Sequence, residues 1–105
     1  NSSIKLYIIQ SIDRNLPLDD IADAKSMEIM DFIGEMERIV YSGTKLDLSY
    51  CLDDYLDEDQ QEEMYKYFIE SESDNLALAL EEFNGEYDEF ELRLYRIKFL
   101  SEVAN

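Results

Sequence analysis

Residues 18–32 carry the spacing Leu18-x-x-Ile21-Ala22-x-x-x-Ser26-Met27-x-x-x-x-Phe32. A small residue such as Ala22 lets two helices cross closely, and a small turn residue four positions later leads into the second of them. The apolar positions that follow then hold this second helix at a fixed angle to the first. The spacing is therefore typical of a helix-turn-helix unit. Many such units have Gly at the turn, whereas this chain has Ser26, which we also expect to cap the third helix.

Helical patterns continue on both sides of this unit. Ile4, Ile8 and Ile12 recur at the spacing of one helix face, and Pro17 disfavours helical geometry in the residue before it. Gly43 lies where the end of a helix favours a left-handed residue. These patterns predict six helices, which begin at residues 2 or 3, 18, 26, 57, 73 or 74, and 88.

The last predicted helix, residues 88–103, is apolar on most of its sides. A helix of this kind is usually surrounded by others, so we expect it at the centre of the fold. Asp88 and Glu91 have the spacing of a capping box at its start. Its polar stripe is narrow and consists of Glu89, Arg93 and Arg96.

Residues 44–56 do not follow one pattern. Apolar residues alternate over residues 46–52 as in a short strand, whereas the spacing of Leu48, Cys51 and Tyr55 suits a helix. We expect an extended or irregular connector here, with a short wing-like segment as an alternative.

The patterns together predict an all-α fold, a compact bundle of about six helices that contains a tri-helical helix-turn-helix unit. We expect residues 1–105 to form a single domain, in which an acidic helical subunit (46–105) packs on the helix-turn-helix unit (1–45). The chain opens without Met, so we expect it to be a piece of a larger protein. Its longest unbroken apolar run, Leu76 to Leu80, is far shorter than the roughly 20 residues of a membrane span, and we expect no membrane partner.

Composition argues against most catalytic chemistry in these residues. The chain has no His, which excludes histidine-dependent nucleophile triads and most catalytic zinc sites. Its three glycines are isolated, so no loop can present successive N–H groups to a phosphate.

The acidic run 53–59 lacks the Gly and the closing Glu of a calcium loop, and we interpret it as a solvated cap before a helix. Cys51 has no basic neighbour in the sequence, and a lone structural thiol fits a reducing compartment. We expect no catalytic, metal or cofactor site here.

Charge is distributed unevenly along the chain. The net charge is −17 in total, but residues 46–91 hold seventeen acids and only Lys66. This block repels nucleic acid and anionic membranes. The third helix adds four acids against one base. Any DNA contact is therefore expected from the N-terminal third or from the basic last helix. The candidate DNA-binding residues are Arg14, Lys25, Arg38 and Lys45.

Four stretches together resemble the C-terminal segment of bacterial RecQ-type ATP-dependent DNA helicases, in which a helix-turn-helix domain follows the helicase core. The most specific parts are Gly-Thr-Lys at 43–45 and Arg-Ile-Lys-Phe at 96–99. The four stretches are residues 4–9, 21–27, 39–46 and 93–102.

The resemblance implies a parent enzyme that unwinds DNA 3′ to 5′ with ATP and magnesium, in DNA repair and recombination in the bacterial cytoplasm, at the nucleoid. It also implies that the present residues are a non-catalytic C-terminal accessory domain, since none of the helicase motifs lies in them. Two roles are open for this domain. It assists DNA engagement through weak contacts, or it is an acidic interaction or autoregulatory domain that binds the helicase core or another basic protein.

Overall fold

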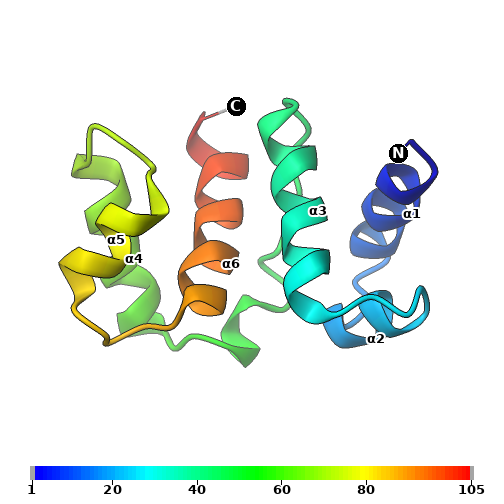
Figure 1. The fold of residues 1–105 in the computed structure, drawn as a ribbon, viewed down its shortest axis with the longest axis horizontal. Coiled ribbons are helices and arrows are strands. Elements are labelled where there is room, and N and C mark those ends of the chain that lie inside the picture. The colour runs from blue at the N-terminus through cyan, green and yellow to red at the C-terminus, as the bar shows by residue number, and fades with distance from the viewer. Residues whose placement is uncertain (1, 105) are drawn as a thin grey trace.

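Helices make up all the regular secondary structure in the computed structural model, which describes residues 2–104 (Figure 1). The all-α prediction is therefore confirmed for these residues, and the radius of gyration is 13.3 Å. The elements are α1 (Ser2–Asp13), α2 (Leu18–Asp23), α3 (Ile29–Tyr41), the 3-10 turn η1 (Leu52–Asp54), α4 (Glu58–Glu70), α5 (Leu76–Phe83), α6 (Glu89–Phe99) and the π-helical turn η2 (Leu100–Ala104).

Helices α1, α2 and α3 pack on one another as the predicted tri-helical unit. Ile8 of α1, Ile21 of α2 and Ile33 of α3 are each no more than 1% exposed. Ala22 is also buried, as the close approach of two helices requires. The hydroxyl of Tyr7 donates a 2.8 Å hydrogen bond to the carbonyl of Ile21 and so ties α1 to α2.

The turn between α2 and α3 corrects the role that we expected for Ser26. Ser26 has a φ of 55°, which is the left-handed conformation that Gly adopts most easily. It therefore helps to end α2 and does not cap the next helix. Helix α2 stops at Asp23, and α3 begins only at Ile29, with Glu28 at its N-cap and no side-chain cap.

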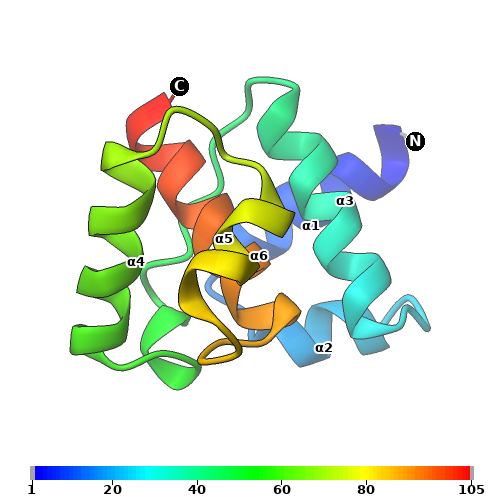
Figure 2. The same ribbon diagram turned by 60° about the vertical axis from the view of Figure 1, so that its left-hand side comes forward.

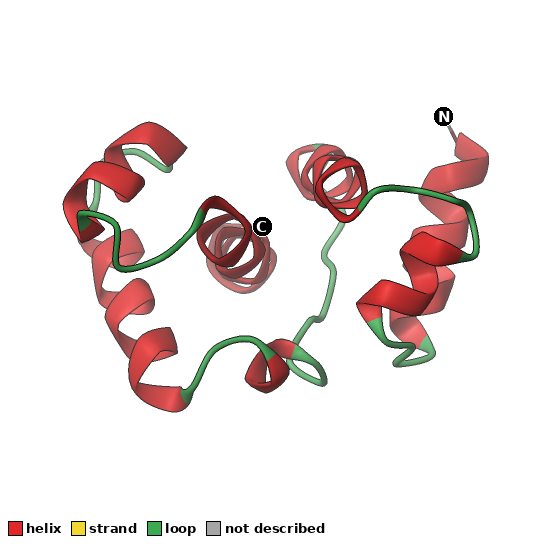
Figure 3. Cartoon of the chain, turned by 60° about the horizontal axis from the view of Figure 1, so that its bottom comes forward, coloured by secondary structure: helices red, strands yellow, loops and turns green. Residues whose placement is uncertain are grey.

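Helix α6 lies at the centre of the fold, as predicted. It packs on α3 on one side and on α4 and α5 on the other (Figures 1 and 3). The capping box of Asp88 and Glu91 is present at its start, and Asp57 and Gln60 form a second one at the start of α4. Its buried residues are Leu92, Leu94, Tyr95, Arg96, Ile97 and Phe99.

Residues 44–56 form the expected irregular connector, and the wing alternative is wrong because no strand occurs in residues 2–104. The connector nevertheless crosses the core, since Leu46, Leu48 and Leu52 are at most 2% exposed. The N–H of Leu46 donates to the Oγ of Ser101 at 3.0 Å. A side chain thus provides the acceptor that a neighbouring strand would otherwise offer.

One expected detail of the acidic half needs adjustment. Helix α5 begins at Leu76, where the Asn75 side chain caps it, and not at residue 73 or 74. On α4, Met64 and Phe68 are buried, whereas Tyr65 and Ile69 are 42% and 47% exposed. None of the helices in residues 2–104 has the length and apolarity that crossing a bilayer requires.

Candidate interaction surface

Helix α3 is the second helix of the helix-turn-helix motif, and two of its faces are covered. One face contributes Phe32, Ile33 and Met36 to the core. The adjoining face carries Gly34 and Glu37, and α6 packs against it. At Gly34 a Cβ atom would lie 3.8 Å from the Nη2 of Arg93, so the guanidinium passes directly over this glycine.

Glu37 joins α3 to α6 through two arginines. Arg93 donates from Nε to Oε2 at 3.0 Å and from Nη2 to Oε1 at 2.5 Å, while Arg96 donates from Nη2 to Oε2 at 2.7 Å. The three side chains are only 10–18% exposed. Burial alone would raise the pKa of Glu37, but the hydrogen bonds from both arginines outweigh it and hold the pKa below its usual value. The hydrogen bond to Glu37 in turn raises the pKa of Arg93.

The same network reaches the loop before α5. Arg96 donates from Nη1 to the carbonyl oxygen of Asp74 at 2.9 Å. The Asp74 carboxylate accepts a 2.7 Å hydrogen bond from the hydroxyl of Tyr41, which lies at the end of α3. Burial first, and then this bond to Asp74, raises the pKa of Tyr41 to about 12. Helix α3 is therefore held along its length by α6 and at its end by this loop.

The remaining exposed face of α3 is acidic. Glu28 and Asp31 face solvent on its first turn. Arg38, the one cation of the helix, is 70% exposed but pairs with Glu35, from Nη2 to Oε1 at 2.5 Å. This pairing lowers the pKa of Glu35 through the hydrogen bond from Arg38. The helix thus presents to solvent no cation that is free of an acidic partner.

The structure does not bring the four candidate DNA-binding residues together. Lys25 lies in the turn before α3 with its Nζ 4.8 Å from the ring centroid of Tyr7, whereas Lys45 follows the other end of α3. Because α3 has 13 residues, its ends are about 20 Å apart. Arg14 is exposed beyond the end of α1, and Arg38 is paired within α3.

Lys45 also has acidic neighbours. It shares a pocket of about 380 Å³ with Asp47, Lys98 and Glu102, and Lys98 is paired with Glu102 at 3.2 Å. Lys5 of α1, and not Lys45, forms a hydrogen bond at the end of α3: its Nζ donates to the Oγ of Ser42 at 3.2 Å. The basic residues of this half are therefore spread over its surface.

The interhelical network was missed by sequence reasoning. Arg93 and Arg96 were expected as a polar stripe of the last helix, and Glu37 as one of the acids that repel DNA. Two arginines three residues apart on an otherwise apolar helix are the pattern that indicates a buried acidic partner. Glu37 is neutralised inside the molecule, so the acidity of the exposed α3 surface comes from other residues.

The thiol of Cys51 and the acidic run 53–59 have structural roles. Burial raises the pKa of the Cys51 thiol to about 11. In the acidic run, Asp57 caps α4 as expected and Asp53 accepts a hydrogen bond from Gln61. Within the described part of the chain, no His, Cys, Asp and Glu side chains cluster in a way that could hold a metal ion.

Comparison with known proteins identifies the N-terminal half. Residues 2–52 match the family model described as the RecQ-1-like helix-turn-helix domain. The match covers α1, α2, α3 and the connector as far as Leu52, and so includes three of the four stretches that carry the resemblance. It does not extend to α4, α5 and α6. No curated protein matches the chain.

Proposed function

Because residues 2–52 match the RecQ-1-like helix-turn-helix family, we propose that the chain is a non-catalytic C-terminal accessory domain of a RecQ-type DNA helicase. The proposed parent unwinds DNA 3′ to 5′ with ATP and magnesium, and acts in DNA repair and recombination at the nucleoid. Within it, this domain engages a protein partner and does not read DNA.

One observation carries the choice of a protein partner: α6 lies along α3 and is joined to it by Glu37. A recognition helix lies in the major groove, which is about 12 Å wide and admits one helix, so a second helix lying along it hinders its entry. Freeing α3 would break the ion pairs of Glu37 with Arg93 and Arg96 and would expose the surface that α3 and α6 share. The free face of α3 also carries Glu28 and Asp31, which repel phosphates.

A second role, weak DNA engagement, is favoured by a different observation. The family match is to a helix-turn-helix domain, and the exposed cations Arg14, Lys25 and Lys45 all lie within the matched residues. Few of them can face one duplex at the same time, because the length of α3 separates Lys25 from Lys45. Such contacts would strengthen a DNA-binding site on the helicase core, but they would not form a DNA-binding site by themselves.

The test compares the full-length helicase with a form that lacks these 105 residues. We expect the affinity for forked DNA to change by less than about twofold, because the domain neutralises few phosphates. The ATPase activity without partner proteins should also persist. A loss of DNA affinity of more than about tenfold on truncation would contradict the proposal, since it would require several phosphate contacts from this domain.

A further inference from the structure

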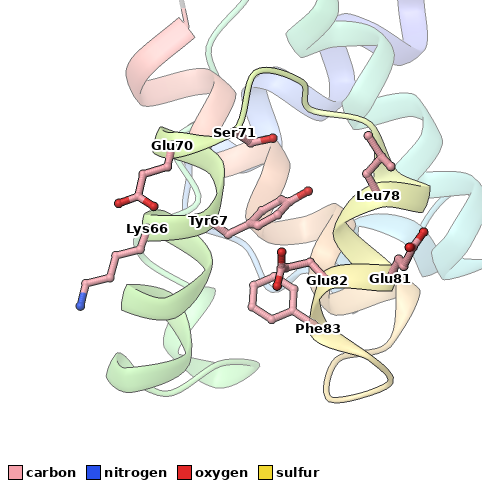
Figure 4. A pocket seen from close by; sticks show the side chains of 8 residues that line it. All are labelled: Lys66, Tyr67, Glu70, Ser71, Leu78, Glu81, Glu82 and Phe83. Carbon is pink, nitrogen blue, oxygen red and sulfur yellow. The ribbon is translucent and has the colours of Figure 1, made fainter.

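A groove of about 850 Å³ lies between α4 and α5, at the end of the molecule farthest from α1 (Figures 1 and 4). Both helices pack on α6 (Figure 2), and this common support leaves an open space between their outer faces. The groove is lined by Lys66, Tyr67, Glu70, Ser71, Leu78, Glu81, Glu82 and Phe83.

Aromatic rings form the floor of this groove. The ring of Tyr67 reaches from α4 into the space between the helices (Figure 4) and meets Phe83 of α5 with a centroid distance of 5.4 Å. Phe83 is supported from behind by Tyr87 at 5.0 Å. On the α5 side the rim carries Leu78, which is 52% exposed. The Tyr67 hydroxyl makes no hydrogen bond to another residue in the described part of the chain. The groove thus combines an aromatic floor with the hydroxyl group of Tyr67.

Acidic side chains lie on both sides of the groove. Glu70 comes from α4, and Glu81 and Glu82 come from α5. The one cation of the lining, Lys66, is paired with Glu62 on its own helix at 3.3 Å. Residues 57–86, which include both helices, hold eleven acids and this single base. Low-dielectric walls that carry one sign of charge concentrate the field in a cleft, so this groove attracts cations.

We propose that the groove binds a Lys- and Arg-rich segment of a partner protein, with one bulky apolar side chain seated between Leu78 and Phe83. Its basic side chains pair with Glu70, Glu81 and Glu82, and an arginine can lie over the Tyr67 ring. This inference rests on the proposed function, because it assigns the partner contact to a specific surface.

The negative charge of the groove favours a basic peptide over other binding partners. A second copy of the chain has a net charge of −17 and would be repelled. Nucleic acids and anionic lipid surfaces are repelled for the same reason. A basic peptide gains from the electrostatic attraction and also covers Leu78, which is half exposed.

The test uses a fluorescein-labelled peptide in which Arg alternates with Ala around one central Leu, with binding measured by anisotropy. The groove variants are Glu81→Lys with Glu82→Lys, and Leu78→Ser. Their matched controls are Asp13→Lys with Asp54→Lys, which change the net charge equally at exposed sites elsewhere, and Leu6→Ser, because Leu6 is 55% exposed on α1. Circular dichroism verifies that every variant keeps its helical content.

We expect the Glu81 and Glu82 reversals to weaken peptide binding at least about fivefold, and Leu78→Ser at least about twofold. Both controls should stay near the original affinity, and a peptide with Gly in place of the central Leu should bind more weakly. Equal losses in the groove and control charge reversals, or equal binding of the Gly peptide, would overturn the proposal by showing attraction to net charge alone. Neither result would alter the DNA measurement that tests the proposed function, so the two can fail separately.

Discussion

The guanidinium of Arg93 on α6 lies against Gly34 and forms two hydrogen bonds to Glu37 on α3, at 3.0 and 2.5 Å. This pair joins the family-matched residues 2–52 to the part of the chain beyond the match. Helix α3 is thereby covered on a second face and keeps only one face exposed to solvent. The two halves of the chain form one continuous hydrophobic core, which includes Ile8 of α1 and Ala79 of α5.

Glu37→Ala should lower the free energy of unfolding by about 3 kcal/mol, because it leaves two largely buried arginines without their acceptor. Urea denaturation followed by circular dichroism measures the change. Glu35→Ala is the matched control, since its partner Arg38 is 70% exposed, and it should leave the stability nearly unchanged. Equal effects of the two variants would show that Glu37 contributes no more than a surface pair.

Stability should depend on pH in two opposite ways. As the pH falls from 7 to about 5, toward the isoelectric point of about 4.1, the net negative charge decreases and repulsion within the acidic block weakens, so the melting temperature should rise. Glu37 has a folded pKa below its ordinary 4.5, so its contribution is complete above pH 4.5 and is lost as the pH falls through the folded pKa. The melting temperature should therefore fall again below about pH 4.5.

Thermal melts from pH 3 to pH 7 check this profile, with the Glu37→Ala variant as the control. The variant should keep the rise between pH 7 and 5 and show a shallower fall at acid pH. A melting temperature that falls steadily from pH 7 to 5.5 would mean that specific carboxylate interactions dominate over repulsion.

Ser26→Gly should stabilise the protein by about 0.5–1 kcal/mol, because Ser26 has a φ of 55° and glycine adopts this conformation without steric cost. Ser26→Ala should give no such gain, since alanine also has a Cβ atom. Comparing the two variants in denaturant melts isolates the backbone effect. Destabilisation by glycine would contradict the assignment of a strained left-handed turn.

Core truncations should separate the centre of the bundle from its edge. Ile97 on α6 is 1% exposed, so Ile97→Ala should cost about 2–5 kcal/mol. Leu80 on α5 is only partly buried, so Leu80→Ala should cost less. Denaturant melts of both variants measure the difference, and equal costs would show that α5 packs as tightly as α6.

Much of the fold could be predicted because it depends on local chemistry. The capping box at Asp88, the helix end at Gly43 and the apolar surface of the last helix are each encoded within a few residues. Ser26 was misassigned because serine suits both a helix cap and a turn, and only the helix crossing decides between them.

Longer-range features could not be predicted in the same way. The pairing of Glu37 with Arg93 spans 56 positions, and the bond between Leu46 and Ser101 spans 55. No local pattern specifies such pairs. The groove beside Tyr67 depends on how two helices diverge from a shared support, which is set by tertiary packing. The acidic character of that region was evident from composition, but its concave shape was not.

DNA binding by the isolated chain should be weak, with a dissociation constant above about 10⁻⁵ M at physiological salt. Affinity of this kind depends on how many cations face one duplex, and the structure separates Lys25 from Lys45 by the length of α3. Binding that remains at low salt should run through the turn and the end of α3, so Lys25→Glu with Lys45→Glu should abolish it. Fluorescence anisotropy with single-stranded, duplex and forked oligonucleotides across a salt series measures this binding.

Lys66→Glu is the control, because Lys66 lies on α4 among acids, and it should leave the residual binding unchanged. Submicromolar binding at physiological salt that survives the double reversal would restore a DNA-reading role for α3.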